Sequence, residues 1–375
     1  METMVSFKDF INKCGSNNIE CRQSSGSRIT YDSRLDYLFN LTSEHLVDMD
    51  VCILIGTNIS DEAPHLNLAL RRRVLENTLK VYVIGSTIGI NFSTIVIGNN
   101  ISNIQRLLSG QHPCCREFVR ARRLGVIIGE NVRTRVDGAK LYDALKNIYK
   151  YTHITCDAWN GLNTLSCSTS FVAGLDLGLV NPKANTFASL MRASQTHMCV
   201  LYLLNTRNVD LLKLKKKNIF IIYQGHHYND NTKYADVVLP GHLYVETTGS
   251  FINMEGRIQQ TICTLKPHIG SRSNSIILNM LSIFLQKHVS PYMNTRTMHN
   301  RLVECIPYYT HKCCIETAFA VVNAKNRFRN YLFVNTTLHS IYTNYYMTNT
   351  VTDVSENMHA CTTFLNPNIY KTICN

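Results

Sequence analysis

Two adjacent histidines in the middle of the chain are the residues best suited to bind a metal ion. His226 and His227 follow the stretch IIYQG, and Asp230 and Asp236 come soon after them. Imidazole nitrogens and carboxylate oxygens are common ligands of zinc and other transition metals. Neighbouring side chains of an extended segment point to opposite faces, so two adjacent histidines rarely reach the same metal ion. We therefore predict a hydrogen-bonded loop here and assign no metal ligand in this chain.

The 14 cysteines are a second possible source of metal ligands. Iron–sulfur clusters need closely spaced thiolates, typically in C-x-x-C runs, and the sequence has none. A disulfide framework needs an oxidising compartment, and the N-terminal stretch METMVSFKDFINK lacks the apolar core of a secretory signal. We interpret the cysteines as buried, reduced thiols.

The patterns of known nucleophiles and phosphate loops are also missing. Neither G-x-S-x-G nor G-x-x-x-x-G-K-[ST] occurs in the sequence. Gly56, Thr57 and Asn58 follow an apolar run, where α/β folds bind nucleotides, but the further glycines of G-x-G-x-x-G do not follow. The equivalent turn in the second half reads Asn205-Thr206-Arg207, and a Cβ there would block the close approach of a ligand. We interpret Gly56 as a turn glycine and predict no catalytic residue.

The elements that position these residues are strands alternating with helices. Continuous apolar runs are typical of strands buried on both faces of a parallel sheet, and a 3.6-residue apolar period is typical of helices. The expected strands are 51–55, 80–85, 124–129, 151–156, 198–204, 218–224 and 235–240, and the expected helices are 63–79, 138–150, 187–194, 273–288 and 296–306. This order predicts an α/β fold with two Rossmann-like lobes and an irregular or helical C-terminal tail.

The pattern also predicts domain boundaries. We expect an irregular N-terminal segment over 1–43, a first α/β lobe over 44–156, a second over 157–290 and the tail over 291–375. The longest apolar run, 276–285, is shorter than the roughly 20 residues of a membrane-spanning helix.

A net charge of +12 and a pI near 9.0 favour acidic partners. The positive charge gathers at 71–73, 120–123 and 213–217. A nucleic-acid-binding protein has such clusters, but no RNP-type aromatic motif and no zinc-finger spacing accompanies them. Exposed helix faces and loops that meet an acidic neighbouring subunit explain the clusters as well. We predict no nucleic-acid partner and keep a basic nucleic-acid-binding protein as an alternative.

One string carries a family resemblance. Residues 235–260, ADVVLPGHLYVETTGSFINMEGRIQQ, resemble a pattern shared by the large subunits of molybdopterin oxidoreductases. Within that group, the combination of FIIYQGHH with ADVVLPG and EGRIQQT is similar to the 75-kDa family of respiratory complex I and its bacterial counterpart. The resemblance covers about residues 1–290 well and the rest weakly, and further stretches that carry it are 50–86, 109–113, 137–145, 175–179 and 351–361.

The resemblance implies a redox-silent chain that keeps the molybdopterin oxidoreductase fold and has lost its cofactor. It therefore implies no catalytic, metal-binding or cofactor-binding residue in this chain, whose enzyme status we leave open. Glu255 and Arg257 are two positions apart and are expected to pair across one face of an extended segment. The positions interpreted as a relic scaffold are Gly56, Asn58, Asp236, Glu246, Asn253, Glu255 and Arg257.

The resemblance also implies partners. The family's iron–sulfur clusters, which carry electrons from NADH toward ubiquinone, lie in an N-terminal ferredoxin-like region that has no counterpart here, so we expect them in a partner chain. That partner would be the N-terminal fragment of a split subunit, alongside other peripheral-arm subunits of complex I. The expected location is the matrix side of the mitochondrial inner membrane, without a membrane span. The alternative enzyme is a fragment of a molybdopterin-dependent, formate-dehydrogenase-like oxidoreductase.

Overall fold

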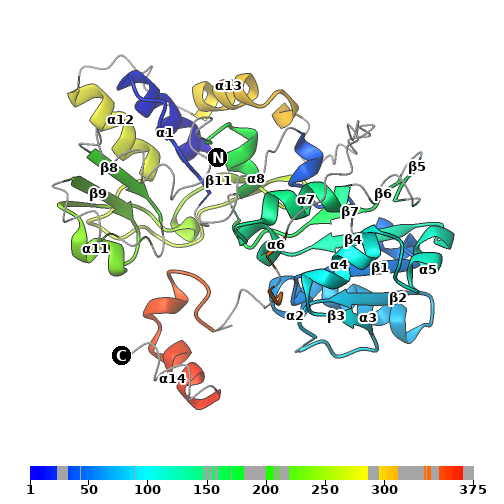
Figure 1. Cartoon of the computed structure of the whole chain (residues 1–375). Helices are drawn as coiled ribbons and strands as arrows, with labels where there is room; N and C mark the ends of the chain where they lie inside the picture. The colour runs from blue at the N-terminus through cyan, green and yellow to red at the C-terminus, as the bar shows by residue number, and fades with distance from the viewer. Residues whose placement is uncertain are drawn as a thin grey trace.

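The computed structural model places two α/β parts side by side, with the last helix below them (Figure 1). The structure describes residues 1–22, 33–42, 44–87, 89–146, 148, 152, 154–156, 159–169, 171–180, 200–206, 209, 211, 219–285, 295–310, 333–334, 336–338 and 346–365. We call the part built on the larger sheet the first lobe and the part built on the second parallel sheet the second lobe.

A five-stranded parallel sheet forms the centre of the first lobe. Its strands are β1 (Val51–Ile55), β2 (Lys80–Ile84), β3 (Ile95–Gly98), β4 (Leu124–Ile128) and β7 (Leu162–Thr164), in the order β3-β2-β1-β4-β7. Central β1 is buried along its whole length, because helices cover both faces of the sheet. The apolar run that predicted this strand is therefore explained by burial on both sides.

Helices in two layers cover that sheet. One face is packed by α2 (Ile59–Glu62) and α3 (Pro64–Leu75), and the other by α4 (Ile101–Leu108), α5 (Cys115–Arg120), α6 (Glu130–Thr134) and α7 (Gly138–Lys146). Alternate β1 side chains face the two layers, as the strand period of two requires: Ile53 belongs to one core cluster and Leu54 to the other.

The second lobe is built on a smaller sheet, also parallel. Its described strands are β8 (Val200–Leu204), β9 (Phe220–Gly225) and β10 (Val237–Pro240), in the order β10-β9-β8. Short helix α11 (Asp230–Tyr234) connects β9 to β10, and α12 (Asn274–Phe284) follows later in the chain. Leu203, Ile221 and Tyr223 form the buried face of this sheet.

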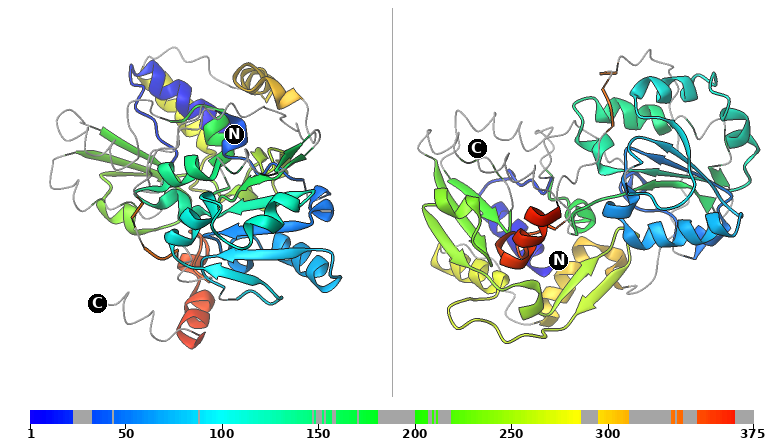
Figure 2. Two further views of the ribbon diagram at one scale, coloured as in Figure 1. Left: turned by 45° about the vertical axis from the view of Figure 1, so that its right-hand side comes forward. Right: turned by 90° about the horizontal axis from the view of Figure 1, so that it is seen from below.

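A third group of elements joins segments that are far apart in the sequence. Helix α1 (Glu2–Lys13) packs against α12, and its Val5 shares a core cluster with α8 (Phe171–Asp176), the hairpin β11 (Gly249–Ile252) and β12 (Ile258–Thr261), and α13 (Thr295–Cys305). Figure 2 shows α1 lying beside α12 from two further directions. The smaller elements are β5 (Thr155–Cys156), β6 (Trp159–Asn160) and α14 (Glu356–Leu365), with 3₁₀ turns at Arg34–Asp36, His45–Asp48, Tyr244–Glu246, Pro307–Thr310 and Thr352–Val354.

The α/β fold with parallel sheets is confirmed, and three details of the prediction are corrected. Glu2–Lys13 form a helix where an irregular segment was expected, because tertiary packing buries Val5 and Phe10. Among the described residues of the expected strand at 151–156, Thr155 and Cys156 form β5, which pairs antiparallel with β6 and does not join the large sheet. The fifth strand of the large sheet is β7, so the first lobe continues beyond the predicted boundary at residue 156.

Two further predictions concern residues that the structure does not describe: the helix at 187–194 and the basic run at 213–217. Among the described helices, none combines the length and the apolarity needed to cross a bilayer.

Candidate functional site

The carboxyl edge of the large sheet is the first place to look for a ligand site. In open α/β sheets ligands bind where the strand order reverses, which here is the point between β1 and β4. Gly56 follows β1 and donates its N–H to Ile84 O at 2.8 Å, while Gly129 follows β4 and donates to Ile55 O at 2.9 Å. A Cβ on Gly129 would lie 2.3 Å from Gly56 O, so these two loops touch each other directly.

A group of polar side chains, of which Asn58 is buried, continues from Gly56. Asn58 is 3% exposed, donates its N–H to Glu62 Oε1 at 3.0 Å and donates Nδ2 to Asp61 Oδ2 at 2.6 Å. Burial is the main cause that raises the pKa of Glu62 to about 7, while the hydrogen bond from Asn58 acts to lower that pKa and the charge of Glu130 acts to raise it. Glu130 itself pairs with Arg133 at 2.9 Å. The Glu62 carboxyl can therefore exchange a proton near neutral pH.

The equivalent edge of the second lobe is filled by protein atoms. Asn205 directly follows β8 and lies in the left-handed region at φ 48°, and its N–H donates to Gln224 O at 2.8 Å. Gln224 is fully buried and donates Nε2 to Asn274 Oδ1 at 2.9 Å. A Cβ on Gly241 would lie 2.0 Å from that same Asn274 oxygen. The first residue of α12 thus occupies the carboxyl edge of β9 and β10, while Arg207 lies outside the described residues.

The geometry assumed for the two histidines is wrong. His226 and His227 do not point to opposite faces: their Nδ1 atoms approach to 2.6 Å and their ring planes meet at 82°. Burial is the main cause that lowers the pKa of His226 to about 4, and the neighbouring His227 contributes to the same shift. The described residues contain no cluster of three or more His, Cys, Asp or Glu side chains that could hold a metal ion.

The residues of the string 235–260 are distributed over three separate places. Asp236 accepts a hydrogen bond from Ile221 N at 2.8 Å, at the amino end of β9 and β10. Glu246 ends a 3₁₀ turn and accepts from Leu243 N at 2.8 Å. Asn253 stands in the turn between β11 and β12. Each of these contacts is made to a main-chain group of the second lobe or of the hairpin.

The β11–β12 turn explains Asn253 and corrects the expected ion pair. Asn253 Oδ1 accepts from Arg257 N at 2.8 Å, and Gly256 permits the turn with φ +85°. Glu255 lies within this turn and Arg257 directly follows it, so the two residues do not share one face of an extended segment as expected. The sequence interpretation treated the stretch as straight and missed the turn glycine.

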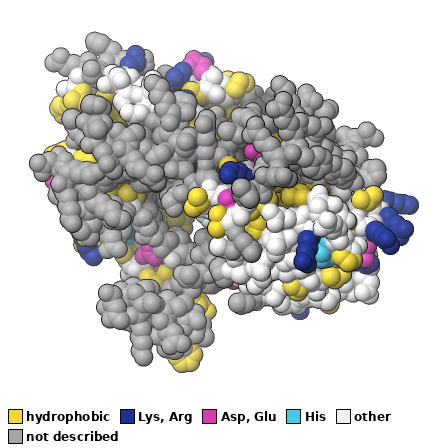
Figure 3. Space-filling view, in the orientation of Figure 1, with side chains coloured by type: hydrophobic (Ala, Val, Ile, Leu, Met, Phe, Trp, Pro, Cys, Tyr) yellow, Lys and Arg dark blue, Asp and Glu magenta, His cyan; other side chains and the backbone are white. Residues whose placement is uncertain are grey.

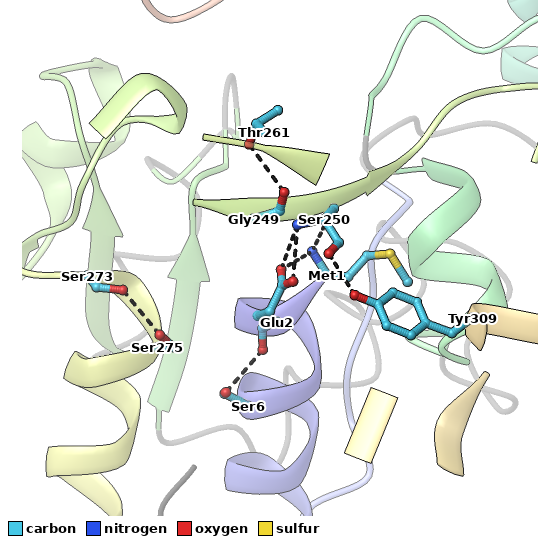
Figure 4. Close-up of polar contacts among 9 residues, drawn as sticks. All are labelled: Met1, Glu2, Ser6, Gly249, Ser250, Thr261, Ser273, Ser275 and Tyr309. Carbon is cyan, nitrogen blue, oxygen red and sulfur yellow. Dashed lines mark hydrogen bonds and ion pairs between the residues drawn. The ribbon is translucent and has the colours of Figure 1, made fainter. Parts of the chain in front are cut away.

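The same hairpin holds the N-terminal helix and the turn after α13. Met1 N donates to Ser250 O at 2.9 Å, the Glu2 carboxylate accepts from Ser250 N, with both of its oxygens at 3.1 Å, and Ser250 Oγ lies 2.7 Å from Tyr309 Oη (Figure 4). Ser250 and Tyr309 are each 1% exposed. Sequence reasoning missed this contact because its partners are separated by 248 and 59 positions.

The hairpin turn also contacts the segment that leads into the first lobe. Phe39 N donates to Met254 O at 2.8 Å. Arg34 donates to Gly256 O at 3.5 Å while its guanidinium pairs with Asp176 of α8 at 3.1 Å. The string therefore forms a structural bracket between α1, α8, α13 and the first lobe, and we call β11, β12 and their turn the bracket hairpin.

Known proteins are similar to this sequence over most of its length. The model of the molybdopterin oxidoreductase family matches residues 1–284. The chain belongs to the molybdopterin oxidoreductase family. Its similarity to a NADH-ubiquinone oxidoreductase 75 kDa subunit of Reclinomonas americana is 32% identity over 373 residues, which is 96% of this chain and 53% of that protein.

Further relatives of this family member carry related names. A mitochondrial NADH-ubiquinone oxidoreductase 78 kDa subunit of Candida albicans is 31% identical over 318 residues, covering 84% of this chain and 42% of that protein. A relative from Rickettsia conorii, named as a subunit of NADH-quinone oxidoreductase, is 30% identical over 368 residues, covering 96% and 51%. The chain thus spans about half the length of these relatives. The resemblance to the 75-kDa family and its bacterial counterpart is confirmed.

The cysteines are less buried than predicted. The side chains of nine are described, all as free thiols, and of these only Cys52 is buried, while Cys14 and Cys263 are exposed. Burial raises the pKa of Cys52 and of Cys21 to about 12, so these two thiols stay protonated at neutral pH.

Two basic clusters of the sequence come together at the amino edge of the large sheet. Arg71–Arg73 lie in the last turns of α3, and Arg120–Arg123 lead from α5 into β4. The Asp50 carboxylate accepts hydrogen bonds from the N–H groups of Arg122 and Arg123. The Arg73 guanidinium donates a hydrogen bond to the carbonyl oxygen of Leu46. Figure 3 shows Lys and Arg side chains gathered at this end of the first lobe. We call Arg71–Arg73 with Arg120–Arg123 the basic edge.

Proposed function

We propose that this chain is a redox-silent structural part of the large iron–sulfur subunit of respiratory complex I, in its peripheral arm. Electrons pass from NADH to ubiquinone through clusters held by other chains, and this chain fixes the geometry around them. Its similarity to subunits of NADH-ubiquinone and NADH-quinone oxidoreductases supports the assembly, and the shared fold of the family supports a scaffold role.

The observation that carries this proposal is the bracket hairpin. In a binding site, the motif residues would converge on one space. Here Asn253 and Gly256 shape a turn, and Ser250 and Met254 hold α1 and the entry to the first lobe through main-chain hydrogen bonds. Such contacts stabilise the relative position of elements and supply no reacting group. The residues of this motif therefore hold neighbouring elements in fixed positions and do not form a reactive site.

The partners belong to the same proposal. The iron–sulfur part of the same subunit is supplied by a separate chain. The basic edge meets an acidic surface of that chain or of another peripheral-arm subunit. The complex stands on the matrix side of the mitochondrial inner membrane, in line with the mitochondrial name of the Candida albicans relative.

Native purification tests the proposal. An affinity tag on this chain is expected to bring down one large membrane-bound assembly with NADH dehydrogenase activity and with partner chains that contain C-x-x-C cluster motifs. Metal analysis of the isolated chain is expected to find neither stoichiometric iron nor molybdenum.

Three results would contradict it. Stoichiometric molybdenum or tungsten in the isolated chain would favour the formate-dehydrogenase-like fragment. Tight, salt-sensitive binding of the chain alone to RNA or DNA, without the assembly, would favour the nucleic-acid-binding protein. A solitary, stable chain that turns over a substrate would exclude a purely structural role.

A further inference from the structure

The crevice where α/β folds of this kind bind ligands holds part of the chain's own C-terminal region. Strand order places that crevice between the carboxyl ends of β1 and β4. Residues 333–334 and 336–338, which we call the crevice segment, lie there in orange beside α2 and α6 (Figure 1). The segment is separated from the strands of this sheet by well over a hundred positions in the sequence, so tertiary packing places it at this edge.

Leu338 fills the space directly over the turn glycines. It is 1% exposed and belongs to the core cluster of the first lobe. A Cβ on Gly56 would lie 3.5 Å from a Leu338 methyl and 2.9 Å from a methyl of Val132, and a Cβ on Gly85 would lie 3.7 Å from Leu338 Cβ. In a nucleotide-binding turn, glycines leave this space free for the phosphates. Here apolar side chains occupy it.

Directed hydrogen bonds hold the segment in place. Leu338 N donates to Asn99 O at 2.9 Å, and Thr337 forms an antiparallel bridge with Asn100 after β3. The segment therefore lies against the loop after β3 at one end, next to the carboxyl edge of the sheet.

A second anchor lies at the start of α7. Arg135 donates to Val334 O at 2.9 Å and to Thr336 Oγ1 at 2.6 Å, and it pairs with Asp137 at 2.8 Å. Asp137 Oδ2 accepts from Val334 N at 2.8 Å. Burial acts to raise the pKa of Asp137, but the Arg135 guanidinium and the Val334 N–H outweigh it and hold that pKa below its ordinary value. Asp137 therefore stays ionised and keeps both bonds at neutral pH.

The residues present do not fit a pterin cofactor at this edge. The cradle over Gly56 is filled by the apolar side chains of Leu338 and Val132. In the second lobe, the turn after β8 carries Asn205 at a position where the close approach of a ligand would need a glycine.

We infer that the crevice segment is an internal occupant of the cofactor crevice, which replaces a ligand and fastens the C-terminal region to the first lobe. The occupant contributes the apolar surface and the hydrogen bonds that close this edge of the sheet. This inference concerns contacts within one chain and does not depend on the assembly proposed above.

Amide hydrogen exchange on the full chain, alone or within its native assembly, tests the inference. Leu338→Asp places a charge in the filled crevice. Val334→Asp is the matched control, because the Val334 side chain is 52% exposed and Val334 forms its hydrogen bonds through main-chain atoms. Leu338→Asp is expected to speed exchange at least tenfold at the N–H groups of Val334 and Leu338 and to lower the Tm by several degrees. Val334→Asp is expected to change neither by a comparable amount.

The design includes a check for global misfolding. Protection of the β1 and β4 amides reports whether the sheet remains folded, and Leu338→Ala is the milder variant if Leu338→Asp unfolds it. Fast exchange of the crevice segment in the unaltered protein would overturn the inference, and so would equal behaviour of the Leu338 and Val334 variants. Displacement of the segment by added ADP or GDP, seen as faster exchange at these amides, would show that a ligand competes for the crevice and would also overturn it.

Discussion

At the scale of single residues, Glu62 is the side chain whose state is set most clearly by its surroundings. Its carboxyl lies behind the Gly56 turn, accepts the N–H of Asn58 and lies near the charge of Glu130. Burial is the main cause that raises its pKa from 4.5 to about 7. The protonated carboxyl therefore favours the folded state, and the ionised form opposes it.

This pKa predicts a pH-dependent stability that Glu62→Gln removes. The favourable contribution of Glu62 is fully present below about pH 4.5 and is lost as the pH rises to about 7, because the folded-state pKa exceeds the unfolded one. Between these two pH values the free energy of unfolding of Glu62→Gln should rise relative to the unaltered protein, by up to about 3 kcal/mol. Denaturant unfolding at several pH values measures it.

Glu44→Gln is the control for this prediction, because Glu44 is exposed. Its stability difference from the unaltered protein should stay constant across the same pH range. Parallel curves for Glu62→Gln and the unaltered protein would contradict a raised pKa at Glu62.

At the scale of elements, the bracket hairpin connects segments that carry no sequence signal for one another. Its strand β11 holds α1 through Ser250, and its turn holds the 33–41 segment through Met254 and Gly256. Gly256 has φ +85°, and a Cβ there would lie 3.0 Å from the Arg34 guanidinium. Because Arg34 is also paired with Asp176, that guanidinium has little freedom to move away.

Gly256→Ala should therefore loosen the bracket as well as strain the backbone. A Cβ in the left-handed region costs about 1 kcal/mol, and the displaced Arg34 contact is expected to double that loss to about 2 kcal/mol. Gly110→Ala is the matched control, since Gly110 has φ +73° and no neighbour within 4 Å of its Cβ position. Unfolding by urea gives the stabilities, and amide exchange at Phe39 reports the bracket itself. Equal losses in both variants, with Phe39 unchanged, would show that the turn holds nothing.

At the scale of the whole molecule, the basic edge and the filled crevice lie at opposite ends of the large sheet. The carboxyl edge is closed by Leu338 and Val132, whereas Arg71, Arg120 and Arg122 at the amino edge are exposed. Electrostatic complementarity contributes mainly to association rate and partner choice. The end of the first lobe that carries the basic edge is therefore the surface to which we expect an acidic subunit to bind.

Reversing the charge of this edge should weaken that association. The triple variant Arg71→Glu, Arg120→Glu and Arg122→Glu is expected to lower the recovery of co-purifying subunits about tenfold at low ionic strength and to reduce the salt dependence of binding. A triple reversal at exposed residues away from the first lobe, Lys13→Glu, Lys266→Glu and Arg296→Glu, changes the net charge equally and should leave recovery unchanged. Equal loss in both variants would indicate a general charge effect and no docking surface.

The layered architecture of this protein can be recognised in short stretches of its sequence. Residues 51–55, 80–84 and 124–128 are largely apolar because both faces of their strands are covered, and that requirement is visible in the composition of each run. The absence of phosphate-loop and nucleophile patterns is likewise a property of short stretches of chain. Such local features need no knowledge of what lies nearby in space.

Which distant segments contact one another depends on tertiary packing. Met1 donates a hydrogen bond to Ser250, Tyr309 contacts the same serine, and Leu338 fills the space over Gly56. In each case the partners are far apart in the chain, and no periodic pattern in the sequence links them. The β11–β12 hairpin and the contact between His226 and His227 both depend on local backbone dihedral angles. A single glycine or turn can change the direction of the chain at such points. Burial and side-chain direction at these points follow from the packing of the whole molecule.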